Sequence, residues 1–485
     1  MIELKNVSFS YGTGDSQRAI EGVSLCVSDG TCTVLCGRSG SGKSTVMRVV
    51  EGLAPGFFPG RREGVVSVGG KDPHSTSPSE KARLIGAVFQ DPRSQFFMSL
   101  VRDEIAFAAE NVGCDENRAR RRLETSAEAF GVASLLDRRV DELSSGQKQR
   151  VALAAAAFLA PKAMVLDEPT SNLDEDGIET LVSSLKRFKE QGISILVCDH
   201  RLHEYLPVAD RYVHISEGHV AHEWTGGEFS QLPCDTLRAM GLRHPDMGLG
   251  RAPVPKATVR APGFSLHSLT VAYGRSSPCV LDASLSIPRA TACGIIGKNG
   301  EGKTTLAKTI CGLRKQVSGS VEICGRTMGA ARRRALCYMV MQDPDYQLYS
   351  DSVARELVMG RAGRLSENLV KEALEAFGIG ELAQRHPASL SGGEKQRVTL
   401  AAAYCANSEV ILLDEPTSGL DADGLVAVAS WARELAKRGR TVLVITHDRL
   451  LCRLACDETL EVEGCRARLS SGAISRPLCT SQPSP

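Results

Sequence analysis

Short apolar runs that each end at a polar turn occur in the same order in both halves of the 485-residue chain. Runs of this length, bounded by turn residues, indicate strands buried inside a sheet. In the first half they lie at residues 33–36, 84–89, 163–166 and 193–198. Helix-forming segments separate them, among them residues 115–130 and 151–160. The pattern therefore predicts an α/β fold that is present twice.

The polar residues around these strands keep the same spacing in both halves. Leu143 precedes Asp167 by 24 positions, and Leu390 precedes Asp414 by 24. A second aspartate follows 7 positions after each of these aspartates, and a histidine follows 33 positions after each. Chance does not preserve three spacings across two copies, so we infer an internal repeat and two domains.

Two glycine-rich loops have the pattern G-x-x-x-x-G-K-[S/T] between an apolar strand and a helix. They consist of Gly37, Arg38, Ser39, Gly40, Ser41, Gly42, Lys43 and Ser44, followed by Thr45, and of Gly297, Lys298, Asn299, Gly300, Glu301, Gly302, Lys303 and Thr304, followed by Thr305. The glycines let successive N–H groups face phosphates, and the helix N-terminus adds partial positive charge. We predict two ATP sites, with each lysine at the β- and γ-phosphates and the last hydroxyl of each motif on Mg²⁺.

The other repeated motifs resemble those of ATP-binding-cassette (ABC) ATPases, and the resemblance covers most of the chain. The matching segments are Leu143–Gln147 and Leu390–Glu394 for the signature, Ala163–Glu168 and Val410–Glu415 for Walker B, and Asp174 and Asp421 for the D-loop. The resemblance implies two P-loop nucleotide-binding domains in one chain. Each would have a RecA-like core, an antiparallel β subdomain and a helical subdomain.

The same resemblance implies roles for single residues. Carboxylates at the Walker B end would hold Mg²⁺ and polarise the attacking water, and a histidine would sense the γ-phosphate. The implied residues are Ser44, Gln90, Asp167, Thr304, Gln342 and Asp414 for the metal; Glu168, His200, Gln90, Glu415, His447 and Gln342 for catalysis; and Tyr11 and Tyr273 for stacking on adenine. Two alternatives stay open, since Tyr11 could be an edge-strand tyrosine and His200 a core histidine.

In this family the two halves stand head to tail, so each ATP would be held by both. One nucleotide would lie between the Lys43 loop and the signature Ser391, Gly392 and Gly393. The other would lie between the Lys303 loop and Ser144, Ser145 and Gly146, where Ser145 replaces the usual glycine. Both halves keep the glutamate and the histidine, so we expect two hydrolysis-competent sites in an intrachain pseudo-dimer.

Composition limits the setting of this activity. The net charge of +1 gives no general attraction to nucleic acid, and no apolar run approaches the ~18 residues that cross a bilayer. The N-terminus continues straight into a strand, so no signal peptide is expected. The arginines of residues 115–130 are flanked by acidic residues, which favours a solvated helix face over a nucleic-acid surface. If the chain serves a membrane process, another chain must supply the membrane part.

The domain boundaries follow from where the periodicity fades. We predict a first domain at residues 1–225, a proline-punctuated linker at 226–262, a second domain at 263–469, and a disordered Ser/Pro-rich tail at 470–485.

The segment after Gln90 narrows the resemblance. Gln95, Phe96 and Phe97 are followed by Glu104, and the second half has Gln347, Leu348, Tyr349 and Glu356 in the same places. This pattern looks like the ATPases of energy-coupling factor (ECF) importers, which take up vitamins and transition-metal ions. The resemblance implies an integral-membrane scaffold permease and a substrate-binding membrane subunit as partners, at the cytoplasmic face of the membrane.

Two other interpretations remain. A tandem sugar-importer ATPase usually has one degenerate site, which this chain does not show. A soluble tandem ABC ATPase acting on ribosomes or DNA usually carries a long charged linker, a zinc module or a coiled coil, and the sequence shows none of these.

Overall fold

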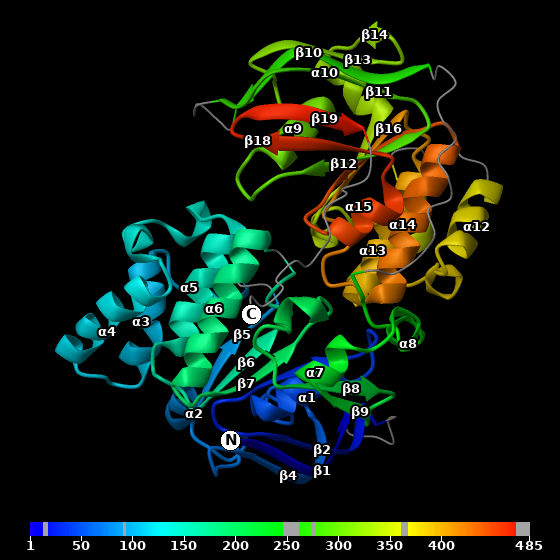
Figure 1. Cartoon of the computed structure of the whole chain (residues 1–485). Helices are drawn as coiled ribbons and strands as arrows, with labels where there is room; N and C mark the ends of the chain where they lie inside the picture. Colours follow the sequence, from blue (N-terminus) through cyan, green and yellow to red (C-terminus); the bar gives the residue numbers. More distant parts are fainter. Residues whose placement is uncertain are drawn as a thin grey trace. The chain divides into compact units, whose positions relative to one another are not determined.

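The computed structural model describes residues 1–12, 18–90, 94–171, 173–245, 261–272, 278–359 and 367–471, and the side chains of Ser145 and Ser471 lie outside this description. The chain divides into two compact units, Met1–Met247 and Gly248–Pro485 (Figure 1). Each unit is described by itself below. Among the described residues, no helix combines the length and the apolar character needed to span a bilayer.

A six-stranded sheet forms the centre of unit 1, with the strand order β5-β6-β7-β3-β8-β9. The first five strands are parallel, and β9 is antiparallel to β8. Every residue of β3 and β7 is buried, as the continuous apolar runs predict. The strands are β3 (Cys32–Cys36), β5 (Ile85–Val88), β6 (Ala163–Asp167), β7 (Ser194–Cys198), β8 (Arg211–Ser216) and β9 (His219–Thr225).

A separate antiparallel sheet, in the order β2-β1-β4, forms the β subdomain of unit 1. Its strands are β1 (Ile2–Tyr11), β2 (Ile20–Val27) and β4 (Gly60–Val68). At the start of the chain, the alternation of apolar and polar residues shifts once by one position, and the structure explains this shift. The β1–β2 register shifts between Leu4 and Val7, where Asn6 has a φ of 51°. The shift is therefore an irregularity within one strand.

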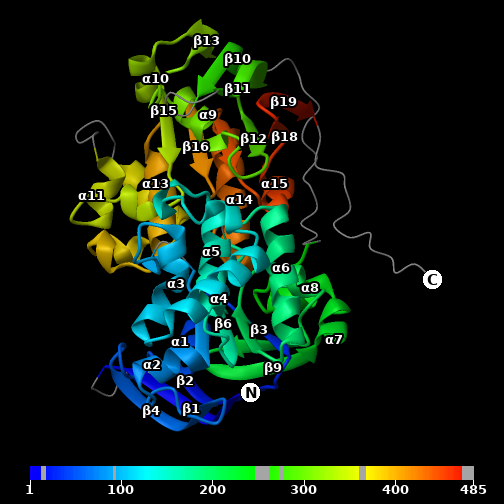
Figure 2. The same ribbon diagram turned by 90° about the vertical axis from the view of Figure 1, so that its left-hand side faces the viewer.

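The helices of unit 1 pack on these sheets and form a helical subdomain around α3, α4 and α5 (Figures 1 and 2). The helices are α1 (Lys43–Val50), α2 (Pro78–Leu84), α3 (Val101–Asn111), α4 (Glu116–Ala129), α5 (Ser145–Ala157), α6 (Glu175–Glu190), and the short turns η2 (Ala133–Leu135), η3 (Val140–Glu142) and η4 (Leu202–Tyr205). The basic helix α4 buries only Ala127, so its arginines lie on an accessible face.

Unit 2 repeats this architecture, with central strand order β15-β16-β17-β12-β18-β19 and a small sheet β11-β10-β13-β14. Its strands are β10 (Pro262–Ala272), β11 (Pro278–Pro288), β12 (Thr291–Ile296), β13 (Ser318–Ile323), β14 (Arg326–Thr327), β15 (Cys337–Val340), β16 (Val410–Asp414), β17 (Thr441–Ile445), β18 (Glu458–Glu463) and β19 (Arg466–Ser471). Its helices are α9 (Lys303–Ile310), α10 (Ala330–Leu336), η5 (Pro344–Tyr346), α11 (Val353–Val358), α12 (Glu367–Ala376), η6 (Gly380–Leu382), η7 (Pro387–Ser389), α13 (Gly392–Cys405), α14 (Ala422–Lys437) and α15 (Arg449–Ala455).

The predicted linker differs from the structure over its first part. Residues 226–245 form α7 (Gly226–Ser230) and α8 (Cys234–Ala239) and belong to unit 1. Phe229 is fully buried and stacks on Tyr212 with ring centroids 3.9 Å apart. Burial of these apolar side chains, rather than helix length, holds the segment in place. The prediction of a linker from residue 226 is therefore wrong for this part.

At the other end of the chain, β19 continues to Ser471, past the predicted start of a tail at 470. The rest of that predicted tail, residues 472–485, lies outside the described residues.

Candidate nucleotide-binding and hydrolysis sites

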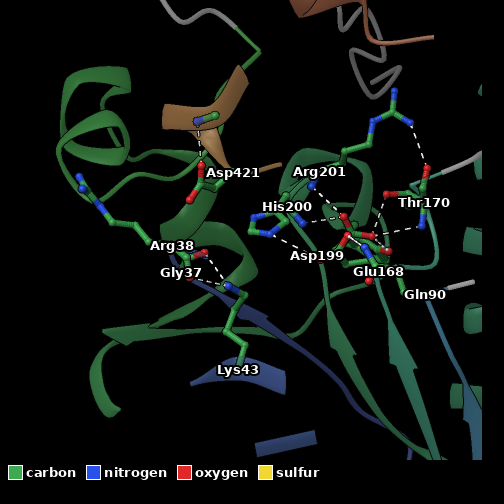
Figure 3. A network of polar contacts seen from close by, with 12 residues as sticks. Gly37, Arg38, Lys43, Gln90, Glu168, Thr170, Asp199, His200, Arg201 and Asp421 are labelled. Atoms are coloured by element: carbon green, nitrogen blue, oxygen red, sulfur yellow. Dashed lines mark hydrogen bonds and ion pairs between the residues drawn. The ribbon is translucent and has the colours of Figure 1, made fainter. Parts of the chain in front are cut away.

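The glycine-rich loop of unit 1 joins the buried strand β3 to α1. Gly37 has a φ of 148° and Gly42 a φ of 108°, which side-chain-bearing residues rarely adopt. A Cβ at Gly37 would lie 2.2 Å from the carbonyl oxygen of Ile215, so only glycine fits there. The buried Lys43 bends back over the loop, and its Nζ donates to the carbonyl oxygens of Gly37 at 2.9 Å and Arg38 at 2.8 Å (Figure 3). The loop encloses its lysine as a phosphate cradle requires.

Unit 2 repeats this geometry closely. Gly297 and Gly302 have φ values of 149° and 92°. Lys303 Nζ donates to the carbonyl oxygens of Gly297 at 2.7 Å and Lys298 at 2.8 Å. The predicted positions of both lysines at the start of α1 and α9 are found in the structure.

The oxygen atoms near the end of each loop fit a magnesium ion. In unit 2, Thr304 Oγ1 lies 3.3 and 3.2 Å from the two carboxylate oxygens of Asp414. Burial raises the pKa of Asp414 and likewise that of Asp167, so each carboxylate would gain from a nearby cation. A hydroxyl and a carboxylate are hard oxygen donors, which Mg²⁺ prefers. Thr304 and Asp414 are therefore the residues that would hold it in unit 2, and Ser44 and Asp167 occupy the equivalent positions in unit 1.

In unit 1, the glutamate that follows β6 lies among the other predicted catalytic residues. Glu168 has a φ of 44°, which turns the chain sharply after Asp167. Its Oε2 accepts a hydrogen bond from Gln90 Nε2 at 2.8 Å, and its Oε1 lies 3.6 Å from His200 Nε2 (Figure 3). Burial, and then the charges of Asp199 and Asp167, raise the pKa of Glu168 to about 8. The structure thus brings together three residues that are separated by up to 110 positions in the sequence.

Unit 2 places its glutamate and histidine in the same way, with one added contact. Glu415 also has a positive φ, 47°, and His447 Nε2 lies 3.4 Å from its Oε1. Here the backbone N–H of His447 also donates to Glu415 Oε2, at 3.4 Å. Gln342 is exposed at the end of β15.

The signature serines begin helices in both units. Ser144 caps α5, accepting the N–H of Gln147 at 3.3 Å, while Gln147 Oε1 accepts the N–H of Ser144. Ser391 and Glu394 form the same reciprocal pair at α13. Each signature therefore presents a helix N-terminus, which attracts anions. Gly146, Gly392 and Gly393 lie in these first turns.

The two predicted adenine-stacking tyrosines have different outcomes. Tyr11 ends β1 beside α1, where its hydroxyl accepts a hydrogen bond from Arg48 Nη1 at 2.9 Å and lies 3.1 Å from Thr45 Oγ1. These contacts place Tyr11 next to the glycine-rich loop, and its stacking role stays a prediction. Tyr273 lies outside the described residues.

Two parts of the unit 1 site were not predicted from the sequence. Asp199 is buried directly before His200, and its signal was a charged residue at the end of an apolar strand. The last residue of α8 also contacts the loop, because Arg38 Nη2 donates to the carbonyl oxygen of Ala239 at 3.1 Å. A capping-box pattern at Thr225 and Glu228, which the structure contains, could have indicated α7.

Comparisons with known proteins agree with this geometry. A sequence model of the ABC transporter family matches residues 20–171 and 280–418. A putative ABC transporter ATP-binding protein of Treponema denticola is 36% identical over 99% of this chain and 97% of its own length. A putative HMP/thiamine import ATP-binding protein of Bacillus subtilis, YkoD, is 30% identical over 95% of this chain and 89% of its own length.

A solved structure also has this tandem fold. It is the archaeal ribosome recycling factor aABCE1 in complex with the ribosomal stalk protein aP1. The TM-score is 0.64 at 23% identity, over 95% of this chain and 89% of the other. At this identity the likeness concerns the fold alone.

Proposed function

Because this chain belongs to the ABC transporter family and hydrolyses ATP, we propose that it is the energy-coupling ATPase of an importer, of the ECF type. The cargo class is a vitamin or a transition-metal ion, which other chains would select. Its cofactors are ATP and Mg²⁺, and it works at the cytoplasmic face of the membrane on a scaffold permease. Its other partner is a substrate-binding membrane subunit.

The observation that carries this proposal is the loop after Gln90. Gln95 ties this loop to β5, because its Nε2 donates to the carbonyl oxygen of Ala87 at 2.9 Å and its Oε1 accepts the N–H of Phe89 at 3.2 Å. The buried Glu104 accepts the N–H groups of Phe97 and Met98 at 2.8 and 2.7 Å. The two polar residues therefore hold residues 95–98 in place by hydrogen bonds.

Unit 2 has the same two sets of hydrogen bonds. Gln347 Nε2 donates to the carbonyl oxygen of Met339 at 3.1 Å, and its Oε1 accepts the N–H of Met341 at 3.0 Å. Glu356 accepts the N–H groups of Tyr349 and Ser350 at 2.9 and 2.8 Å. The glutamine and the glutamate of the ECF-like pattern thus hold the same loop by hydrogen bonds in both units.

The loops held by these hydrogen bonds carry exposed aromatic rings. Phe97 is 74% exposed and Tyr349 is 72% exposed. A large aromatic side chain on a loop fixed by hydrogen bonds is typical of a protein interface, since it buries much area at little entropic cost. Gln90, at the other end of the unit 1 loop, donates to Glu168. Phe97 lies seven positions after Gln90, so a partner bound to Phe97 would act close along the chain to the residue that contacts the predicted catalytic base.

An apolar cavity next to this loop supports the same proposal. It has a volume of about 300 Å³ and is lined by Glu51, Leu53, Pro78, Lys81, Ala82, Ile85, Ala87 and Phe89. Phe89 immediately precedes Gln90, so the cavity, the loop and the site are continuous along the chain. A membrane scaffold could insert a helix end here and sense the nucleotide state. The name of the Bacillus subtilis relative, an HMP/thiamine import protein, supports uptake of a vitamin precursor.

The second candidate is a soluble tandem ATPase that acts on ribosomes, since the ribosome recycling factor aABCE1 has the same tandem fold. The two candidates differ in their partner. A tagged full-length chain, isolated from its own host, should co-purify with an integral-membrane scaffold from detergent extracts. The double change Phe97→Ala with Tyr349→Ala should lower that recovery about tenfold, since exposed aromatic anchors dominate interfaces.

The matched control for this experiment is Val65→Ala. Val65 is 57% exposed on β4 of unit 1 and lies outside both the loop and the cavity, so recovery should not change. Association with salt-washed ribosomes and with no membrane protein would replace the importer proposal with the second candidate.

We further propose that each ATP is held by the loop of one unit and the signature of the other. The triphosphate needs donors around its whole periphery, and one loop covers one side only. Ser144→Trp and Ser391→Trp would each fill the start of a signature helix. ATP turnover should fall sharply in each variant, whereas undiminished turnover in the double variant would contradict shared sites.

A further inference from the structure

In unit 1, a buried carboxylate lies directly before the predicted γ-phosphate sensor. Asp199 follows β7 and is only 2% exposed (Figure 3). Its Oδ1 accepts the backbone N–H groups of His200 at 2.6 Å and Arg201 at 2.9 Å. Its Oδ2 accepts the Thr170 hydroxyl at 2.7 Å, the Thr170 N–H at 3.3 Å and the Tyr205 hydroxyl at 2.7 Å. Five donors therefore compensate the burial of this carboxylate.

These donors belong to two loops that carry predicted catalytic residues. Thr170 lies two positions after Glu168, in the turn that follows β6. His200, Arg201 and Tyr205 lie in the segment that follows β7. Asp199 therefore ties the loop of the predicted general base to the loop of the histidine.

Unit 2 carries other residues at two of the equivalent positions. Thr446 replaces Asp199, is fully buried, and accepts the N–H of Asp448 at 2.9 Å. Cys452 stands where Tyr205 stands in unit 1. The aspartate and one of its donors are thus replaced together, as expected if they act as a pair.

The histidine backbone shows the consequence. The N–H of His200 donates to Asp199, whereas the N–H of His447 donates to Glu415 Oε2 at 3.4 Å. In unit 1, Glu168 Oε2 instead accepts the side chain of Gln90. Asp199 therefore takes up a backbone donor that would otherwise compete for the glutamate.

We propose that Asp199 is a positioning residue of the first hydrolysis site. It holds the Glu168 turn and the His200 loop as one body and keeps the oxygens of Glu168 for Gln90, His200 and the attacking water. The first site depends on this carboxylate for its chemical step, and the second site does not have it. The inference rests on ATP hydrolysis by the chain and is independent of the importer proposal.

A purely structural role for Asp199 predicts something different. Loss of a buried residue with five donors would lower the stability of unit 1 and weaken ATP binding, without selectively slowing the chemistry of one site. The two roles are separated by measuring the rate of the chemical step, the affinity for ATP and the unfolding temperature of the same variants.

The test uses the full chain with one site silenced. In a Glu415→Gln chain, single-turnover hydrolysis reports the first site. Asp199→Thr, which copies unit 2, should slow that step about tenfold, because it removes charge-assisted hydrogen bonds. Tyr205→Phe removes one donor and leaves the carboxylate, so it should slow the step a few-fold. ATP affinity should change less than twofold in both variants. In a Glu168→Gln chain, Asp199→Thr should leave second-site turnover unchanged.

Asp210→Asn provides the matched control. Asp210 accepts the N–H of Cys32 at 2.8 Å, at the start of β3, so it lies at the other end of the strand that leads to the phosphate loop. Its change should not alter first-site chemistry. If Asp199→Thr fails to fold, the test uses two other variants. These are Asp199→Asn, which keeps the shape of the side chain, and Tyr205→Phe. The proposal is overturned if these folded variants hydrolyse ATP at the unchanged rate, or if they slow both sites equally.

Discussion

The two units share the backbone of their sites and differ in what surrounds it. In both, a lysine donates to two carbonyl oxygens of its own loop, and the glutamate predicted as general base has a φ near 45°. In both, a serine with a capping box begins the signature helix. The surroundings are not shared, because in unit 1 α8 contacts the loop through Arg38 and Asp199 lies beside His200.

This difference separates two kinds of constraint. Features that depend on backbone geometry, such as a glycine with positive φ or a helix start, recur in both copies. A Cβ at Gly37 or at Gly297 would lie 2.2 Å from a carbonyl oxygen, and a serine caps each signature helix. Features that depend on side chains from several elements have diverged. The two units therefore share the backbone features of their sites and differ in the side chains that surround them.

The largest effect should come from the shared part. Lys43→Ala and Lys303→Ala each remove the cation that the loop encloses, so each should weaken nucleotide binding at its own site about 100-fold. Binding of a fluorescent ATP analogue to each single variant would measure this. If only one change weakened binding, the two loops would not be equivalent despite their common geometry.

An effect of similar size should come from α8, which the structure describes in unit 1. Leu237 of α8 is fully buried, so Leu237→Ala should destabilise unit 1 by about 2–4 kcal/mol. Denaturant unfolding measures the change. Leu281→Ala is the control, because Leu281 is 48% exposed and its loss should cost less than about 0.5 kcal/mol. Equal effects of the two changes would argue that α8 is not part of the unit 1 core.

The smallest effect concerns pH. Burial first, and then the charges of His222, Lys43 and Arg38, lower the pKa of His214 from 6.5 to about 4. The unfolded chain therefore binds this proton more readily, and unit 1 loses stability as the pH falls from 6.5 towards 4. His214→Phe should remove roughly 1–2 kcal/mol of that loss at pH 5 and change little at pH 7.5.

Unfolding curves at these two pH values check the His214 prediction. Unit 2 has the exposed Glu461 at the equivalent place, so its stability should not share this dependence. An equal gain from His214→Phe at both pH values would show that packing, and not protonation, is responsible.

The sequence predicted the strands and loops that carry the candidate sites in both units. An apolar run such as residues 163–166 indicates a buried strand, and parallel strands end at one edge of a sheet, so polar residues after them converge. The fold class follows from the same pattern. The irregular register at Asn6 also appeared in the sequence, as a slip in the alternation.

The parts that differ between the units could not be predicted in this way. Helices α7 and α8 have five and six residues, too few for a periodic pattern, and Phe229 is buried against Tyr212, His203 and Trp224. Asp199 gains its role from donors at Thr170 and Tyr205, which no local pattern connects to it. Such contacts depend on the tertiary structure.

The central claim is that both units hydrolyse ATP. Steady-state turnover of the chain with Glu168→Gln, and separately with Glu415→Gln, tests it most directly. Each change removes one predicted general base, so each alone should lower turnover, by up to about 100-fold if the sites act together. Turnover that stays at the level of the unchanged chain in either variant would show that this unit does not contribute to catalysis.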